Sequence, residues 1–415
     1  MSQIILKKDA GPIVFLGSMN AMPMMYAIEL KKLGYPVLYF VDAHFDDHLN
    51  RPESHFQDIS YPYPSWIKEL QLSSQLFLPF AKAGFSKFIE QKVRNFSDET
   101  PQLYVLNGFF ISLAPSLKNK AHNVIALSHG SDLDSWADKS EDNQLIDSFS
   151  GMSFFKFLPK TISSKLIRHV VSTQYNGLEN SDKVIYFPKK FNDRGDIVIN
   201  ELIKSGVKYH ERYDISFEPL IKEDRTFKQR EGKLVVFSGV RFLFETFTEG
   251  NQMYSKGNDI IIKGIAEFYK QYKDIEVHFV EKGPDVQKAK ELCKELGIES
   301  LIQWHSEMKF SELLKLYRKA DICFDQVGKH WIAAIGGYAL WLGKPLIANA
   351  ELSIKSGVWP SDTPVLDAKT PEQISESLHA LLDDEYRKTI SEESKVFAER
   401  YFSPNKLLEE IFSFQ

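Results

Sequence analysis

The stretch that decides the fold is residues 321–349, DICFDQVGKHWIAAIGGYALWLGKPLIAN. Its apolar residues 322–324 predict a buried strand, and a loop that contains glycine follows. Residues 333–342 predict a helix, which the Gly-Lys-Pro run at 343–345 ends, and residues 346–348 predict another strand. Such a unit presents backbone N–H groups and a helix N-terminus at a sheet edge, where anions bind well. The alternative is an ordinary strand–helix unit of a parallel sheet.

Length and composition indicate a two-domain globular protein. The chain has 415 residues, and this length is more than one hydrophobic core usually serves. Its 43% hydrophobic and 26% charged residues are typical of a globular protein. A net charge of -5 and a pI near 6.2 argue against a nucleic-acid partner, whose binding site would be basic. The two cysteines, Cys293 and Cys323, have no metal-binding spacing and indicate a reducing compartment.

The location predicted from the sequence is cytoplasmic. No apolar run approaches the ~20 residues that a membrane-spanning helix needs. The first residues, MSQIILKKD, lack the ordered regions of a signal peptide.

The N-terminal half begins like a nucleotide-binding domain. Residues 13–16 predict a buried strand, Gly17 a turn, residues 22–33 a helix and residues 37–41 a second strand. The dinucleotide fingerprint needs three spaced glycines, and only Gly17 is present. A dinucleotide cofactor is therefore disfavoured.

The segment from Tyr61 to Phe96 interleaves aromatic and basic residues. Within it, residues 65–75 and 80–95 predict helices with an amphipathic face. Helices that pack on the sheet are the favoured interpretation. The alternative is a surface that lies against lipid head groups or a lipid-linked substrate.

Polar residues follow the predicted strand at 124–128. His129, Gly130 and Asp132 come where open α/β sheets place their ligands, at the carboxyl end of a parallel strand. An isolated histidine is more often structural, but the neighbouring glycine lets a ligand approach. We therefore favour a functional His129.

The C-terminal half alternates strands and helices. The expected strands are 234–237, 275–280 and 301–304, and the expected helices are 260–272, 285–296 and 311–320. This alternation predicts a parallel sheet with helices on both faces. The fold class is therefore α/β, with two Rossmann-like doubly wound domains that face each other across a cleft. A polar connector at 215–232 suggests the boundary: domains 1–222 and 223–398, with a C-terminal helix in 399–415 that packs back toward the first domain.

The order of motifs in residues 233–412 resembles GT-B-type retaining glycosyltransferases of the group 1, family 4-like class. The matching residues are Ser238-Gly-Val-Arg241, Lys256-Gly-Asn-Asp259, Glu281-Lys-Gly283, the Glu312–Asp321 run, Asp325-Gln326 and Gly343-Lys-Pro345. Each motif is weak alone, and their order is what makes the set specific. In the first half the match is looser, at the Gly17 turn and the His129-Gly130-x-Asp132 segment.

The resemblance implies a set of site residues. Arg241 and Lys256 match the basic pair that grips the donor diphosphate, and His129 matches a histidine near the reacting carbon. These three are the candidate catalytic residues. The candidate donor-binding residues are Gly17, Gly239, Arg241, Lys256, Glu281, Trp304, His305, Gly328, His330, Trp331 and Tyr338, and the candidate acceptor-side residues are Asn20 and Asp132.

The resemblance also implies a reaction without a cofactor or a required metal. Two fixed cations stabilise a departing nucleoside diphosphate without a divalent ion. The Asp132-Leu-Asp134 run lies in the acceptor half, away from the expected diphosphate.

The sequence departs from the family at two positions. The family commonly has two glutamates eight positions apart, and His330 and Tyr338 stand there instead. Tyr338 can donate a hydrogen bond to a hydroxyl but cannot accept two from a ribose diol. The alternative is that Tyr338 only packs in its helix.

Three functions follow as hypotheses. The leading one is a metal-independent glycosyltransferase that moves a sugar from a nucleotide-sugar to a glycan or lipid-linked acceptor. Its expected role is bacterial surface polysaccharide assembly. A peripheral contact with the inner face of the membrane is compatible with this role. A nucleotide-sugar epimerase of the same architecture is the second, although it needs cleft carboxylates for proton transfer. The third is a non-catalytic protein that binds glycans or nucleotide-sugars.

Overall fold

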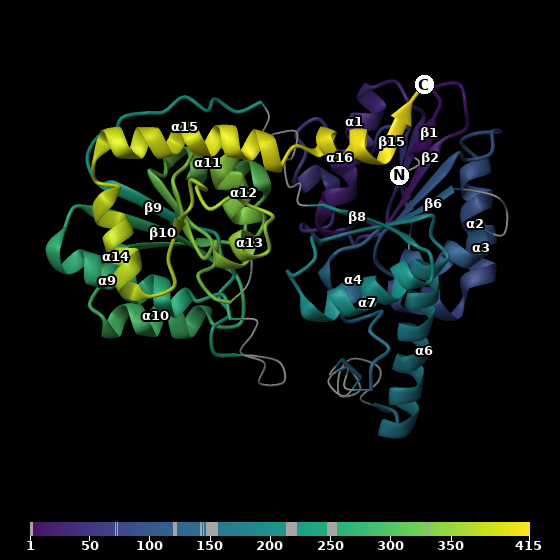
Figure 1. Cartoon of the computed structure of the whole chain (residues 1–415), viewed down its shortest axis with the longest axis horizontal. Helices are drawn as coiled ribbons and strands as arrows, with labels where there is room; N and C mark the ends of the chain where they lie inside the picture. The colour runs from purple at the N-terminus through teal and green to yellow at the C-terminus, as the bar shows by residue number, and fades with distance from the viewer. Residues whose placement is uncertain are drawn as a thin grey trace. The chain divides into compact units, whose positions relative to one another are not determined.

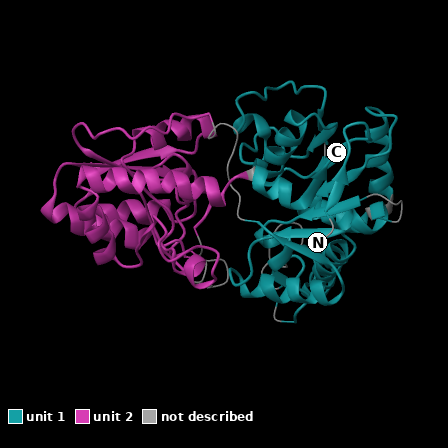
Figure 2. Ribbon diagram, turned by 45° about the horizontal axis from the view of Figure 1, so that its top comes forward, with its two compact units in different colours: residues 1–213, 404–415 teal, residues 214–403 magenta. Residues whose placement is uncertain are grey.

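The computed structural model of the chain describes residues 3–70, 72, 74–118, 123–141, 143, 145–146, 157–212, 222–246, 255–329 and 332–415. Two compact units divide the chain (Figure 2): residues 1–213 with 404–415 form unit 1, and residues 214–403 form unit 2.

Unit 1 contains a seven-stranded parallel sheet in the order β4-β3-β2-β5-β6-β7-β8. Because β2 pairs with both β3 and β5, the winding direction reverses between β2 and β5. The strands are β2 Ile13–Leu16, β3 Val37–Val41, β4 Ile67–Glu69, β5 Leu103–Leu106, β6 Asn123–Leu127, β7 Lys183–Tyr186 and β8 Lys208–Glu211.

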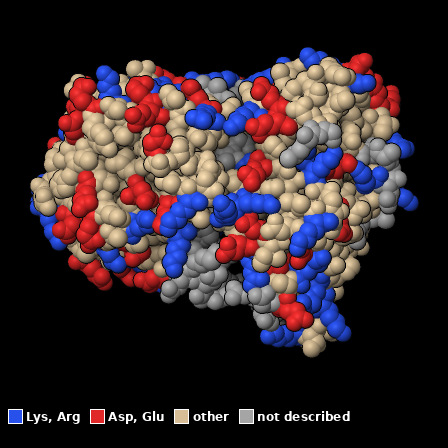
Figure 3. Space-filling view, in the orientation of Figure 1, with Lys and Arg blue, Asp and Glu red and all other residues tan. Residues whose placement is uncertain are grey.

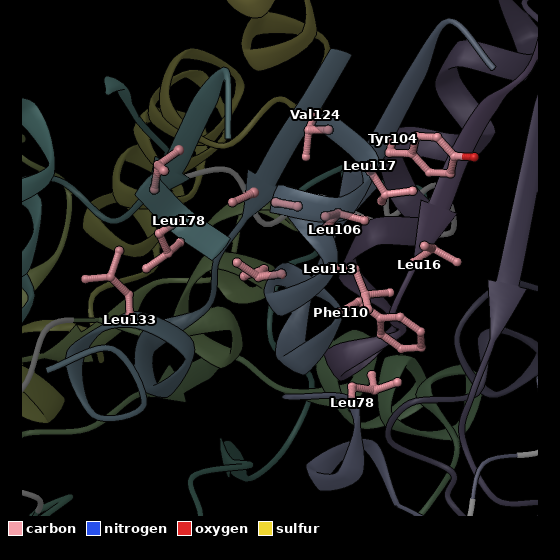
Figure 4. Close-up of a cluster of buried hydrophobic side chains, with 14 of the residues drawn as sticks. Leu16, Leu78, Tyr104, Leu106, Phe110, Leu113, Leu117, Val124, Leu133 and Leu178 are labelled. Carbon is pink, nitrogen blue, oxygen red and sulfur yellow. The ribbon is translucent and has the colours of Figure 1, made fainter. Parts of the chain in front are cut away.

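Helices cover this sheet and enclose an apolar core. They are α1 Met22–Lys32, α2 Lys82–Arg94, α3 Ala114–Lys118, α4 Gly130–Asp134, α6 Lys160–Glu179 and α7 Asp193–Lys204, with short 3-10 helices η1 Met19–Ala21, η2 Pro52–Ser54, η3 Gln75–Phe80 and η4 Gly108–Leu113. Figure 4 shows Leu106 and Tyr104 of β5 beside Phe110, Leu113 and Leu117 of η4 and α3. Every residue of β5 is buried, as expected for a parallel strand that is covered on both faces.

Unit 2 contains a six-stranded parallel sheet in the order β11-β10-β9-β12-β13-β14. Its strands are β9 Leu234–Ser238, β10 Ile275–Glu281, β11 Ile302–Ser306, β12 Ile322–Phe324, β13 Leu346–Ala348 and β14 Leu366–Asp367. In chain order within the unit this is 3-2-1-4-5-6, the arrangement of dinucleotide-binding domains. The winding direction reverses between β9 and β12, where such sheets bind their ligands.

The helices of unit 2 alternate with these strands along the chain, and the last two, α14 and α15, follow β14 (Figure 1). They are α9 Asn258–Gln271, α10 Val286–Glu295, α11 Phe310–Lys319, α12 Ala334–Trp341, α13 Glu351–Lys355, α14 Pro371–Ala380 and α15 Asp384–Tyr401. None of the helices in the described part of the chain is both long and apolar enough to cross a membrane.

The C-terminal segment belongs to unit 1. After α15 come α16 Pro404–Ile411 and β15 Phe412–Phe414, and β15 pairs in parallel with β1 Ile4–Leu6. Leu408 and Ile411 of α16 are buried, and α16 packs against α1.

The boundaries between the units differ from those expected, 222/223 and 398/399. Unit 1 ends with β8 and Arg212, whose N–H donates to the Tyr186 carbonyl. The second boundary falls at 403/404, because α15 runs as one continuous helix to Tyr401.

One sequence prediction of secondary structure is wrong. Residues 65–75 were expected to form a helix, whereas residues 67–69 form β4, the edge strand that pairs with β3. Three residues are too few for a periodic pattern to identify a strand. The second expected helix, 80–95, corresponds to α2.

Candidate active site

The candidate donor site of unit 2 lies where β9 and β12 end. These strands are paired, with Ser238 opposite Phe324. The loop after β9 carries Gly239 and Arg241, and the loop after β12 carries Asp325 and Gly328. The carboxyl ends of adjacent strands at a reversal of winding form the usual ligand crevice of this sheet type.

Lys256 is brought to this edge by close backbone packing. The Lys256 carbonyl accepts hydrogen bonds from the N–H groups of Val327 (3.1 Å) and Gly328 (3.3 Å). A Cβ added to Gly328 would lie 1.9 Å from the Ser255 carbonyl oxygen. Only glycine therefore allows the two loops to approach in this way.

Asp325 holds the start of α12. Its carboxylate accepts N–H groups of Gln326 (2.7 Å), Ala333 (2.6 Å) and Gly336 (3.1 Å), and the residue is 2% exposed. The Ala333 N–H belongs to the N-cap residue of α12, and the Gly336 N–H belongs to its first turn. The helix N-terminus that the sequence predicted as an anion site is therefore capped by a carboxylate of the protein itself.

Three charged groups interact at this edge. Burial raises the pKa of Asp325, and Lys256 opposes that rise. Burial lowers the pKa of Lys256, while Asp325 raises it and Arg241 lowers it further. Lys256 thus interacts with one carboxylate and with a second cation, which leaves positive charge for an incoming anion. Asp325 belongs to the Asp325-Gln326 motif, but the sequence did not predict it as a site residue.

Arg241 is exposed on a loop that packs against the β10–α10 turn. The Phe242 N–H donates to the Lys282 carbonyl (2.7 Å). Gly283 has a φ of +107°, and an added Cβ would lie 2.8 Å from Cγ of Arg241. Among the described residues, no carboxylate lies within the 4.0 Å of an ion pair from the guanidinium of Arg241 or the Nζ of Lys256.

Other predicted donor-binding residues have partners elsewhere in unit 2. Glu281 forms an ion pair with Lys290 (2.5 Å). The Trp304 ring packs against Phe242 and Phe279, with centroids 5.5 and 5.4 Å apart. These contacts give Glu281 and Trp304 a structural role in unit 2.

His305 follows Trp304 on β11 and therefore points to the opposite face of the sheet. Its Nε2 lies 2.7 Å from Nδ1 of His278, and Nε2 of His278 lies 2.6 Å from Glu276. Trp304 and His305 therefore do not share one binding surface.

Tyr338 is buried in α12, with 7% of its surface exposed. Its ring packs edge-to-face on Phe310 at 5.1 Å and lies 6.4 Å from Tyr317. This position favours the packing alternative. His330 and Trp331 lie outside the described residues.

In unit 1, the corresponding reversal of winding joins the ends of β2 and β5. Gly17 has a φ of +96°, and an added Cβ would lie 2.5 Å from the Asn107 carbonyl oxygen. The Asn107 side-chain oxygen accepts the Met19 N–H (3.2 Å). Asn20 has a φ of +55° and its N–H donates to Asn50 (2.6 Å). Asn107 therefore determines the path of the loop after β2.

His129 has a defined neutral form. Because the Asn107 oxygen accepts from Met19, its Nδ2 is the donor to Nδ1 of His129, 2.7 Å away. The imidazole proton is then on Nε2, which is buried without a hydrogen-bond partner in the described structure. Burial lowers the pKa of His129 well below its ordinary value. His129 is thus a neutral N–H donor with an unused proton.

Asp132 holds the backbone at His129 and Gly108 in place. Its carboxylate accepts the N–H groups of His129 (3.0 Å) and Gly108 (3.2 Å). Burial raises the pKa of Asp132 to about 7, and the charge of Arg212 opposes the rise. Arg212 is itself 3% exposed, and burial lowers its pKa to about 10. Sequence analysis missed Arg212, which directly follows β8 and shows no local motif.

Asp134, the other carboxylate of the Asp-Leu-Asp run, has separate partners. It accepts hydrogen bonds from the Tyr186 hydroxyl (3.1 Å) and Asn192 (2.7 Å). Within the described ranges, no group of three or more His, Cys, Asp or Glu side chains is arranged to hold a metal ion.

Two α/β units with these strand orders define the GT-B fold. The chain matches a sucrose-phosphate synthase from Thermosynechococcus elongatus (TM-score 0.60, 12% identity, 97% of each chain). It also matches a glycosyltransferase from Rickettsia africae (0.59, 14%, 97% of each chain). A third match is a putative UDP-N-acetylglucosamine 2-epimerase from Listeria monocytogenes (0.54, 12%, 98% of this chain and 96% of that one).

Sequence similarity to curated proteins is more limited. A D-inositol 3-phosphate glycosyltransferase from Corynebacterium aurimucosum is 27% identical over 157 residues, which are 36% of this chain and 37% of that protein. No protein-family model matches the chain. The predicted two-domain GT-B fold is confirmed.

Proposed function

We propose that this protein is a retaining glycosyltransferase that transfers a sugar from a nucleoside-diphosphate sugar to a glycan or lipid-linked acceptor. The observation that carries the proposal is the pair of neighbouring cations, Arg241 and Lys256, at the β9–β12 reversal, where Asp325 is the carboxylate that acts on Lys256. The GT-B fold and the similarity to a D-inositol 3-phosphate glycosyltransferase support it.

The proposed chemistry is a displacement on one face of the sugar. The bond between the anomeric carbon and the diphosphate oxygen breaks, and an acceptor oxygen forms a bond to that carbon on the same side. The acceptor proton passes to the diphosphate. Arg241 and Lys256 stabilise the negative charge that develops on the leaving group, without a required metal ion.

His129 contributes a neutral donor in this proposal. A protonated imidazole would favour the diphosphate nonspecifically, whereas a neutral Nε2–H donates one directed hydrogen bond to a sugar oxygen. Its low pKa keeps it in this form across the neutral range. Asp132 acts on the position of His129 through the backbone.

The donor is found first with a thermal-shift screen of nucleotides and nucleotide-sugars, since a ligand that binds the folded state raises its stability. With the donor in hand, Arg241→Ala should lower turnover ~10²-fold or more while the fold survives. Lys263→Ala is the matched control, because Lys263 is exposed on α9 and pairs with Asp259. Near-normal transfer by Arg241→Ala would sink the proposal.

An epimerase is the second candidate, because one of the matching structures is that of a putative UDP-N-acetylglucosamine 2-epimerase. Incubation with the nucleotide-sugar and no acceptor distinguishes the two. An epimerase changes the sugar, whereas a transferase leaves it or only hydrolyses it slowly.

We further propose a peripheral contact with the cytoplasmic face of a membrane through unit 1. Phe77 is 56% exposed, Phe80 is 45% exposed, and the Phe80 ring stacks on His169 of α6 at 5.1 Å. Lys and Arg side chains gather over the protruding end of α6 (Figure 3). Apolar rings beside basic groups suit an anionic lipid surface.

Co-sedimentation with phosphatidylglycerol vesicles tests this contact. Phe77→Ser combined with Phe80→Ser should abolish it, whereas Val396→Ser, which removes a 69% exposed apolar side chain from α15, should not. Equal binding by all three proteins contradicts the contact.

A further inference from the structure

A basic cavity lies at the end of the unit 2 sheet opposite the candidate donor site. Its volume is about 640 Å³, and its walls include Lys233 before β9, Asp321 before β12 and Lys344 before β13. The strands are parallel, so their amino ends lie opposite the edge that carries Lys256 and Asp325. The cavity is therefore separate from the candidate donor site, and its volume suits a small molecule.

The lining of this cavity is strongly basic. Seven of its residues are Lys or Arg and three are Asp or Glu, whereas the whole chain carries a net charge of -5. A concave surface with one dominant sign of charge concentrates ions of the opposite sign.

Three of these cations have no carboxylate partner among the residues that the structure describes. Lys344 donates to the carbonyls of Ala320 (2.8 Å) and Arg318 (3.3 Å), and Arg230 donates to the Tyr272 hydroxyl (2.7 Å). Lys233 is exposed. In the described structure, none of Lys344, Arg230 and Lys233 has an Asp or Glu oxygen within 4.0 Å. Their charges are thus available to a ligand.

Asp321, a carboxylate in the cavity wall, already accepts a backbone hydrogen bond. Asp321 accepts the Val235 N–H at 2.8 Å. Burial raises the pKa of Asp321, and the charges of Arg387, Lys344 and Arg230 oppose the rise. One buried carboxylate shared by several cations does not neutralise the cavity. Arg387 also pairs with Asp384 at 2.5 Å, which holds its guanidinium in place.

The cavity also has apolar walls. Phe227, Val235 and Leu342 line it together with the basic residues, and the Arg387 guanidinium lies 5.9 Å from the centre of the Phe227 ring. Apolar surface beside several cations suits an organic molecule that carries phosphate groups.

We propose that this cavity binds a phosphate-bearing small molecule through Lys233, Lys344 and Arg230. This second anion site is independent of the glycosyltransferase proposal. Its position before β9, β12 and β13 lies outside the residues that the GT-B resemblance assigns to the donor.

The test is calorimetric titration of the full-length chain with inorganic pyrophosphate. Wild type should bind at two classes of site, the cavity and the donor loops. Arg230→Gln combined with Lys233→Gln should weaken the cavity site ~10-fold or more and leave the donor loops unchanged. Lys315→Gln is the matched control, because Lys315 is 62% exposed on α11, pairs with Glu312 and lies outside the cavity.

Arg241→Ala combined with Lys256→Ala separates the two proposals. Loss of all pyrophosphate binding in this variant overturns the cavity site, whereas loss of one class leaves the cavity site standing. If Arg241→Ala with Lys256→Ala keeps both classes of pyrophosphate site, while the cavity variant loses one class, the donor-site assignment is wrong and the cavity site is supported.

A phosphate group can also come from a lipid. Vesicles of phosphatidylglycerol are therefore titrated in parallel. Vesicle binding that is lost with Arg230→Gln and Lys233→Gln, together with no pyrophosphate binding at the cavity, would overturn the small-molecule proposal. Unchanged vesicle binding together with loss of one pyrophosphate class supports it.

Discussion

The side-chain amide of Asn107 donates a hydrogen bond to Nδ1 of His129 across 2.7 Å. This contact ties the end of β5 to the end of β6, and it selects the tautomer whose proton is on Nε2. The same Asn107 side chain donates to the Leu127 carbonyl (2.6 Å) and accepts the Met19 N–H (3.2 Å). Three strand ends of unit 1 thus depend on one amide.

Asn107→Ala should lower the free energy of unfolding by about 2–3 kcal/mol, because buried donors and acceptors lose their partner. Asn107 is 1% exposed. The matched control is Asn123→Ala, whose side chain donates to the Gln102 carbonyl at an exposed position and should cost about 0.5 kcal/mol or less. Urea denaturation measures both. Equal costs at the two sites would contradict the proposed importance of Asn107.

His129→Gln should change the pH dependence of stability. Burial lowers the pKa of His129 well below its ordinary value, so the unfolded chain takes up a proton near pH 6.5 that the folded chain does not. The stability that depends on neutral His129 is therefore complete above about pH 6.5 and is lost as the pH falls.

The cost of His129→Gln, measured by urea denaturation, should accordingly shrink by up to ~1.4 kcal/mol per pH unit below about pH 6.5. The control variant, measured over the same pH range, is His169→Gln at an exposed position of α6. A cost of His129→Gln that does not change with pH would show that its folded-state pKa is ordinary.

Asp132→Asn should show the opposite slope. Burial raises the pKa of Asp132 to about 7, so the folded chain keeps a proton that the unfolded chain loses near pH 4. The contribution of protonated Asp132 to the free energy of unfolding is complete below about pH 4 and is lost as the pH rises toward 7. The variant should therefore gain stability relative to wild type by roughly 2 kcal/mol between about pH 5 and pH 7.

Thermal or urea unfolding at a series of pH values measures this gain. The control variant, measured at the same pH values, is Asp362→Asn at an exposed position. If Asp132→Asn tracks wild type at every pH, Asp132 has an ordinary pKa.

The fold was predictable from the sequence where strands are continuously apolar. Residues 13–16, 37–41 and 322–324 are buried on both sides and have the predicted bounds. The pairing of β1 with β15 was not predictable, because it joins residues 4–6 to 412–414 across nearly the whole chain.

The candidate site was predictable only in part. Arg241 and Lys256 follow recognisable motifs, and the structure couples them electrostatically. Trp304 could not be assigned from the sequence, because an aromatic residue on a strand can either stack on the nucleobase of a donor or pack in the hydrophobic core. Its contacts with Phe242 and Phe279 in the structure indicate packing. The capping of α12 by Asp325 depends on the loop geometry between residues 325 and 333, which sequence periodicity does not contain.

Asp325→Ala should destabilise unit 2 more than the loss of an ordinary helix cap. Asp325 is 2% exposed and accepts three N–H groups, and Lys256 also loses its counter-charge. We expect a cost of about 3 kcal/mol. Asp383→Ala at the start of α15, where the side chain accepts the Tyr386 N–H (2.8 Å), should cost ~1 kcal/mol. Equal costs in denaturation curves would contradict the role assigned to Asp325.

Gly257→Ala tests the packing that positions Lys256. Gly257 and Gly297 have nearly the same left-handed φ, +71° and +69°, so alanine carries a similar backbone strain of ~1 kcal/mol at both. The surroundings differ. An added Cβ at Gly257 would lie 2.7 Å from Val327 and 2.8 Å from the Gly328 nitrogen, whereas nothing lies within 4 Å at Gly297.

Gly297→Ala should therefore show the backbone strain alone, and Gly257→Ala should cost about 2 kcal/mol more because the 255–257 and 327–328 loops must separate. That separation also moves Lys256, so Gly257→Ala should weaken binding of the nucleoside diphosphate while Gly297→Ala leaves it unchanged. Unfolding curves and calorimetry measure the two effects. If both alanine variants lose the same stability and bind equally, the close approach of the two loops does not position Lys256.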